Sequence, residues 1–153
     1  MPQGRQHRPH SSNQPIAVKT HALLADPGLT RLGASVEAQE WVTRINRGLV
    51  AISTVTLLEV GYSARSSIEL SAALGNPPIS DMPVEYLAPA IEDRAIEVQR
   101  LLAQRGHHRA PSVADLLIAA TAEGTGRTVL HVDKDFELIA GITGQPCERL
   151  LLP

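Results

Sequence analysis

Short apolar runs alternate along this chain with longer amphipathic stretches, and this alternation limits the fold more than any other feature. Helical patterns fill most of the chain between the apolar runs. Strands that alternate with helices form parallel sheets covered by helices on both faces. We therefore predict an α/β fold, a three-layer α/β/α sandwich with a central, mainly parallel sheet. The candidate strands are residues 22–25, 49–52, 84–87, 128–132 and 149–152.

Local signals predict where two of the helices begin. Ser35 is expected to cap the first helix, on which Val36 and Trp41 share a face toward the core. Ser112 is expected to cap a later, apolar helix, and this places Asp115 at the third helical position. A short helix is predicted from residue 136 to 140, directly after the strand at 128–132.

Length and composition are those of a single soluble domain. The chain has 153 residues, of which 43% are hydrophobic and 20% are charged, so it can bury a core without help. No apolar run approaches the roughly 20 residues that span a bilayer, so we expect no membrane partner. Cys147 is the single cysteine, which excludes an intramolecular disulfide and a cysteine-rich zinc site. A reducing cytoplasm is the expected location.

The first 21 residues differ from the rest of the chain. They contain Arg5, Arg8 and Lys19 but no acidic residue, and they are rich in Gln, His, Ser and Pro. We expect a flexible basic arm at 1–21, followed by one domain at 22–153. Without the arm, 11 basic residues face 16 acidic ones, a net charge of −5. Such an acidic body does not favour a broad nucleic-acid-binding surface.

Acidic residues recur beside or inside the apolar segments, where an unpaired carboxylate is costly. They are Asp26, Glu59, Asp115 and Asp133, with Asp135 as a fifth. Two of them follow predicted strands, and open α/β sheets bind ligands beyond the carboxyl ends of their strands. Oxygen ligands suit a hard cation such as Mg²⁺ or Mn²⁺. The pattern therefore predicts a metal site that supports phosphodiester hydrolysis, because a bound metal activates water and stabilises phosphate charge.

Each of these residues also has a simpler interpretation. Asp135 alone is typical of a helix N-cap, Glu59 of a solvated helix residue, and Asp115 of a first-turn acid that complements the helix dipole. Arg105 and Arg109 belong either to a solvated loop or to a surface that contacts RNA phosphates. The grouping of the acids, rather than any one of them, favours the metal site.

Three segments together resemble the PIN-domain ribonucleases of the VapC toxin type, from about residue 23 to 152. They are TLLEVGYSAR around Glu59, GHHRAPSVADLLIAATAE around Asp115, and VDKDFELIA with Asp133 and Asp135. The resemblance implies that Asp26, Glu59, Asp115 and Asp133 are catalytic metal ligands, with Asp135 at or near the site. It also implies Mg²⁺- or Mn²⁺-dependent cleavage of structured RNA, commonly tRNA or rRNA.

The same resemblance implies two protein partners, a cognate VapB antitoxin and a second copy of the chain in a homodimer. The first motif departs from the family pattern, because relatives usually show D-x-S or D-x-T where this chain has Asp26, Pro27 and Gly28. Gly28 has no hydroxyl to orient metal or water, and Thr30 is a possible substitute. A catalytically weakened domain that binds antitoxin or RNA is therefore the alternative. A phosphoacceptor protein is a third hypothesis, but nucleotide-phosphate loop motifs are absent.

Overall fold

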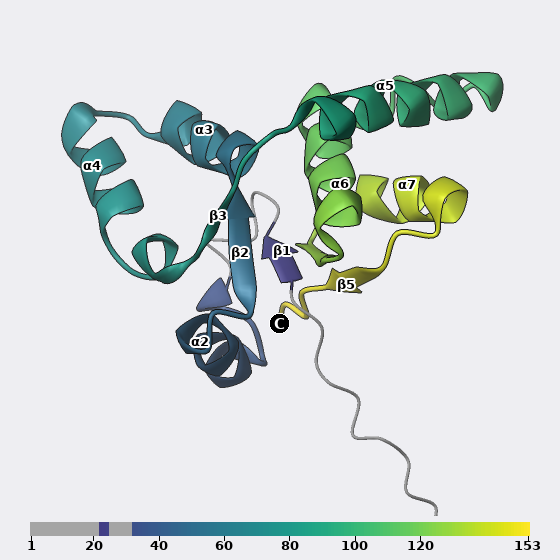
Figure 1. Ribbon diagram of the computed structural model, residues 1–153. Coiled ribbons are helices and arrows are strands. Elements are labelled where there is room, and N and C mark those ends of the chain that lie inside the picture. The colour runs from purple at the N-terminus through teal and green to yellow at the C-terminus, as the bar shows by residue number, and fades with distance from the viewer. Residues whose placement is uncertain (1–21, 25–31) are drawn as a thin grey trace, which may run out of the picture.

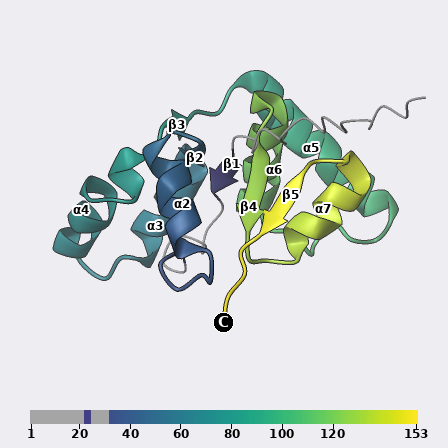
Figure 2. The ribbon, with the colours of Figure 1, turned by 90° about the horizontal axis from the view of Figure 1, so that it is seen from below.

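The computed structural model describes residues 22–24 and 32–153. Five strands form one sheet in the order β3-β2-β1-β4-β5, and each neighbouring pair is parallel. The sheet is therefore parallel throughout the described residues, which confirms the predicted fold class. Figure 2 shows β2, β1, β4 and β5 side by side. The strands are β1 (Ala22–Leu24), β2 (Val50–Ser53), β3 (Val84–Glu85), β4 (Thr128–His131) and β5 (Cys147–Arg149).

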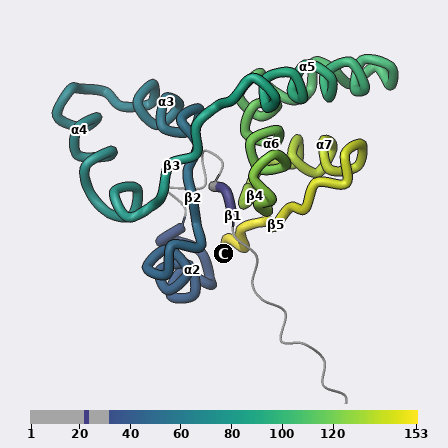
Figure 3. Tube along the Cα trace, viewed as in Figure 1, coloured from purple at the N-terminus to yellow at the C-terminus, as the bar shows by residue number. Residues whose placement is uncertain are grey.

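Helices connect the strands, as parallel pairing requires. Figures 1 and 3 allow the longest connection to be followed from β3 through two helices to β4. The described helices are α2 (Ala38–Asn46), α3 (Thr54–Ser63), α4 (Ser67–Gly75), the short 3₁₀ helix η1 (Ile79–Asp81), α5 (Pro89–Gln104), α6 (Val113–Thr125) and α7 (Asp135–Thr143). None of them is long and apolar enough to cross a membrane.

Two hydrophobic clusters pack against the sheet from opposite sides, because successive strand residues point to opposite faces. Leu23 and Val129 belong to a cluster with residues of α5, α6 and α7, which Figure 1 shows gathered together. Ala22 and Leu130 belong to the other cluster, with residues of α2 and η1. The two clusters confirm helices on both faces of the sheet.

The start of α2 corrects one prediction. Glu37, and not Ser35, occupies the N-cap position of α2, and no side chain caps it. The Ser35 hydroxyl instead donates a hydrogen bond of 3.0 Å to the Leu151 carbonyl and accepts one of 3.2 Å from the Glu37 amide. The Ser35 side chain, which the sequence pattern predicted as a helix cap, therefore bonds to the C-terminal segment instead. Val36 is 66% exposed, so it does not share the buried face of Trp41.

β5 begins earlier than predicted, because Cys147 pairs with Val129 and Arg149 with His131. Leu150 is buried but follows the end of the strand.

The predicted arm at 1–21 lies outside the described residues, so the division into arm and domain stays a prediction.

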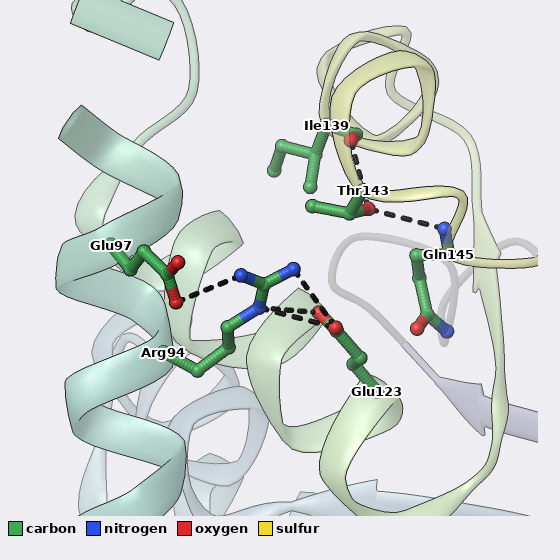
Figure 4. Close-up of polar contacts among 6 residues, drawn as sticks. All are labelled: Arg94, Glu97, Glu123, Ile139, Thr143 and Gln145. Atoms are coloured by element: carbon green, nitrogen blue, oxygen red, sulfur yellow. Dashed lines mark hydrogen bonds and ion pairs between the residues drawn. The ribbon is translucent and has the colours of Figure 1, made fainter. Parts of the chain in front are cut away.

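Arg94 of α5 forms one ion pair within its own helix and one with α6. Figure 4 shows Arg94 between Glu97 of the same helix, at 2.9 Å, and Glu123 of α6, at 3.0 Å. In the same view the Thr143 hydroxyl donates to the Ile139 carbonyl and accepts from the Gln145 amide. The Arg94–Glu123 pair therefore links α5 to α6, and the Thr143 contacts lie at the end of α7.

Ile118 provides a test of the core. Its side chain is fully buried on α6, so Ile118→Ala should reduce the free energy of unfolding by about 2–5 kcal/mol. Ile68 is 83% exposed, and Ile68→Ala should change it by no more than about 0.5 kcal/mol. Urea denaturation followed by circular dichroism measures both, and similar losses in the two variants would contradict this packing.

Candidate metal centre

Asp115 lies in the first turn of α6, where the local sequence fixes its carboxylate. The Ser112 hydroxyl accepts a hydrogen bond of 3.0 Å from the Asp115 amide, and the Asp115 Oδ2 accepts one of 3.0 Å from the Ser112 amide. This reciprocal capping box confirms Ser112 as the N-cap and Asp115 as the third helical residue. One carboxylate oxygen is engaged by the backbone, and the other, Oδ1, is left for a further partner.

Asp133 and Asp135 stand on the turn between β4 and α7. The Asp133 Oδ1 accepts a hydrogen bond of 3.0 Å from the Asp135 amide, which closes this turn. Asp135 is the first residue of α7, and the N-cap position belongs to Lys134, whose side chain makes no capping hydrogen bond. The prediction of Asp135 as an N-cap is therefore wrong, and its carboxylate is not used to start the helix.

These three aspartates bring their carboxylate oxygens together. One oxygen from each of Asp115, Asp133 and Asp135 lies within 4.8 Å of the other two. Two oxygens bound to one Mg²⁺ are at most about 4.2 Å apart, since each bond is about 2.1 Å. The three carboxylates therefore lie near enough to share one ion once their side chains adjust, and their all-oxygen donor set fits a hard cation.

Burial and mutual repulsion disturb the carboxyl groups when no ion is bound. Burial raises the pKa of Asp115 above its ordinary value, hydrogen bonds from Ser112 oppose this rise, and the Asp133 charge adds to it. For Asp135, burial raises the pKa first, followed by repulsion from Asp133 and from Asp115. Both groups therefore resist ionisation, which a cation would reverse.

Two other predicted ligands are not in this trio. Glu59 lies in the middle of α3, is partly buried, and its main-chain carbonyl accepts a hydrogen bond of 3.0 Å from the Ser63 hydroxyl. Its carboxylate does not belong to the group formed by the described residues. Asp26 lies outside the described residues, as do Gly28 and Thr30. The structure therefore unites three of the five predicted acids.

Residues around the trio were identified only in part from the sequence. His131 is 1% exposed and packs against Phe136, with ring centroids 5.6 Å apart, and its burial lowers its pKa. This supports the structural role that its place beside a buried strand suggests. The sequence pattern was not used to predict the capping box between Ser112 and Asp115, although a serine three residues before an acidic residue is a known signal for this pair of hydrogen bonds.

The predicted RNA-binding arginines lie before α6. Arg105 is the C-cap residue of α5, and Arg109 belongs to the connection that leads to Ser112. Both side chains are exposed. The connection therefore leads from these two cations directly to the helix that carries Asp115.

Comparison with known proteins finds a family and close relatives. The family model described as the PIN domain matches residues 29–142. Ribonuclease VapC2 of Mycobacterium tuberculosis (strain CDC 1551 / Oshkosh) is 59% identical over 84% of this chain and 91% of its own length. Ribonuclease VapC51 of Mycobacterium tuberculosis (strain ATCC 25618 / H37Rv) is 46% identical over 68% of this chain and 74% of its own. Among solved structures, VapBC2 from Rickettsia felis bound to a promoter DNA fragment superposes with a TM-score of 0.68 at 16% identity, covering 84% of this chain and 97% of that one.

Carboxyl titration by ¹³C NMR in EDTA tests the electrostatics of the trio. Asp115 and Asp135 should titrate above the ordinary value of about 3.9, because burial disfavours their charged forms. In Asp133→Asn both pKa values should fall, and Asp135 should respond more strongly, since repulsion by Asp133 is its larger electrostatic cause. Unchanged titration of Asp135 in this variant would contradict the close grouping.

The same shift predicts how stability depends on pH. A carboxyl whose pKa is higher in the folded than in the unfolded protein stabilises the fold at low pH, and this contribution is lost as pH rises through the folded pKa. In EDTA, the parent should therefore lose stability relative to Asp135→Asn as the pH rises above about 4, the ordinary aspartate value, because the variant has no carboxyl group at this position to ionise. Parallel thermal unfolding curves across that range would rule out the raised pKa.

Proposed function

Because this chain belongs to the PIN-domain family, and within it to the VapC ribonucleases, we propose that it is a metal-dependent endoribonuclease and the toxin of a type II toxin–antitoxin pair. The observation that carries the proposal is the grouping of Asp115, Asp133 and Asp135 within 4.8 Å. Carboxylates placed this closely suit a divalent cation better than any neutral ligand, because a cation offsets both their mutual repulsion and the burial that raises the pKa of Asp115 and Asp135.

The proposed cofactor is Mg²⁺ or Mn²⁺, held by the trio together with Asp26 and Glu59. A bound divalent cation supplies a water of lowered pKa and offsets charge on the phosphate. The Ser112 capping box holds one Asp115 oxygen and orients the other. The Asp135 amide does the same for Asp133. The protein's own contribution is therefore to fix the donor oxygens before any ion or substrate binds.

The proposed substrate is structured RNA, either tRNA or rRNA. Arg105 and Arg109 are the residues proposed to bind its phosphates, because both are exposed and neither pairs with a described carboxylate. Guanidinium groups match phosphate oxygens in a bidentate way. Specificity would come from the shape and exposed loop bases of the RNA.

The proposed partners are a VapB-type antitoxin and a second copy of this chain, in the cytoplasm. Apolar surface supports a protein partner. Helix α4 has no buried residue although its sequence is largely apolar, and on α3 Leu58 is 75% and Tyr62 is 92% exposed. Apolar side chains grouped on a surface mark interaction sites.

A second function has a specific observation in its favour. Gly28 stands where relatives of this type usually carry serine or threonine, so the first motif lacks a hydroxyl. A domain with weakened catalysis would still bind antitoxin or RNA. The substitution Gly28→Ser separates this alternative from the nuclease, because it restores the hydroxyl without touching the trio.

Cleavage of total tRNA and rRNA with Mn²⁺, with Mg²⁺ or with EDTA tests the proposal. The parent should cut a discrete RNA only with metal. Asp115→Asn should lower the rate by at least about 10- to 100-fold, the loss typical even of residues one step from a metal. Asp93→Asn is the matched control, because Asp93 is exposed on α5 and away from the trio, and it should cut normally.

The outcomes separate the two functions. Metal-independent cleavage, or full activity in Asp115→Asn, would refute the metal-dependent nuclease. Cleavage by Gly28→Ser alone would mean that the altered first motif has weakened an otherwise complete site. If no variant cuts any RNA while a VapB-type antitoxin is still bound, the binding module replaces the enzyme as the function.

A further inference from the structure

We infer that the RNA backbone reaches the metal centre across the connection between α5 and α6, bound there by Arg100, Arg105 and Arg109, and not across α7. The inference rests on the proposed function and names the path of the substrate to that site. It adds Arg100 to the predicted pair and assigns the RNA to one flank of the centre. Three features of this segment support the inference. They are its positive charge, the lack of ion pairs between its arginines and the described carboxylates, and its fixed backbone.

The segment before Asp115 is basic in an otherwise acidic protein. The 17 residues between Glu97 and Asp115 contain three arginines and two histidines but no acid. Arg100, Arg105, His107, His108 and Arg109 are all exposed. Outside the first 21 residues the chain carries a net charge of −5, so a polyanion has little reason to bind elsewhere.

Most arginines of the described chain are already neutralised, but these three are not. Ion pairs hold Arg44 to Glu148 at 3.2 Å, Arg94 to Glu97 and Glu123 as Figure 4 shows, and Arg127 to Glu85 at 2.7 Å. Arg65 and Arg149 also pair with glutamates. Within the described ranges, Arg100, Arg105 and Arg109 pair with no carboxylate. Their donors therefore remain available for phosphate.

The backbone of the connection is fixed before any ligand binds. Gly106, with a φ of 73°, ends α5 in a Schellman motif, in which the His107 amide donates to the Leu102 carbonyl at 2.9 Å and the Gly106 amide to Ala103 at 3.0 Å. The Ala110 amide then donates to the His107 carbonyl at 3.2 Å, closing a turn around Arg109. The capping box follows at Ser112. A fixed backbone lowers the ordering cost of binding.

The turn after β4 and the start of α7, which carry the other two aspartates of the centre, are acidic and unsuited to a polyanion. Asp133, Asp135 and Glu137 follow one another on the turn and first residues of α7. Arg149, the cation beside them, lies 3.5 Å from Glu137 and is partly neutralised by it. Lys134 is the remaining positive charge on this turn. Phosphates would be repelled along α7, so the approach over the α5–α6 connection is favoured.

RNA binding without cleavage tests this path. The probe is labelled total tRNA with Asp115→Asn protein in EDTA, followed by fluorescence anisotropy over a range of salt. Replacing Arg100, Arg105 and Arg109 by glutamine should weaken binding about tenfold or more, and should reduce the slope of log affinity against log salt by about 0.7 for each lost contact with single-stranded RNA. Arg47→Gln is the matched control, because Arg47 is also exposed and unpaired but lies at the end of α2.

The result that supports the inference is a loss confined to the triple variant, with a reduced salt slope and unchanged thermal unfolding. An unchanged affinity overturns it, and so does a loss of binding free energy in Arg47→Gln equal to the loss per arginine in the triple variant, which would mean that total charge alone controls binding. Loss of antitoxin binding with intact tRNA binding also overturns it, by assigning the segment to the protein partner. This measurement needs no catalysis, so its failure is distinct from failure of the nuclease assay.

Discussion

Parallel pairing of all described strands is the constraint on which this molecule depends. Each strand must return to the same edge before the next begins, so a helical connection is needed between neighbours and both faces become covered. β1 lies between β2 and β4, and Leu24 is in register with Ile52 and Leu130. The carboxyl ends of these strands are therefore level, and the turn after β4 opens beside the first turn of α6. The candidate metal centre is a product of this topology.

Electrostatic repulsion within the trio is the cost of that arrangement. Asp115 is held by its capping box and Asp133 by the turn into α7, so neither carboxylate can relax without breaking a backbone hydrogen bond. Burial raises the pKa of Asp115 and of Asp135 first, and repulsion by Asp133 adds to the rise in both. A site that stores repulsion in fixed oxygens binds a divalent cation with little reorganisation. The arginines on the α5–α6 connection follow the same principle with the opposite charge, because the backbone that carries them is fixed before a ligand binds.

Local patterns predicted those parts of the structure that local forces determine. The order of strands and helices, and Asp115 at the third position of a helix capped by Ser112, follow from periodicity and capping chemistry. Patterns failed where a distant segment decides. Ser35 bonds to Leu151 rather than capping α2, and Val36 is exposed rather than facing the core. The convergence of Asp115 with Asp133 depends on tertiary packing, which only the structure reports, and Asp26 lies outside the residues it describes.

The central claim is that Asp115, Asp133 and Asp135 hold a divalent cation. The most direct measurement is anomalous diffraction from crystals of this protein grown with Mn²⁺. We expect an anomalous peak within bonding distance, about 2.1–2.3 Å, of oxygens from at least two of the three aspartates, and its disappearance in Asp133→Asn. A peak bound elsewhere, or no peak at saturating Mn²⁺ with the three carboxylates ordered, would contradict it.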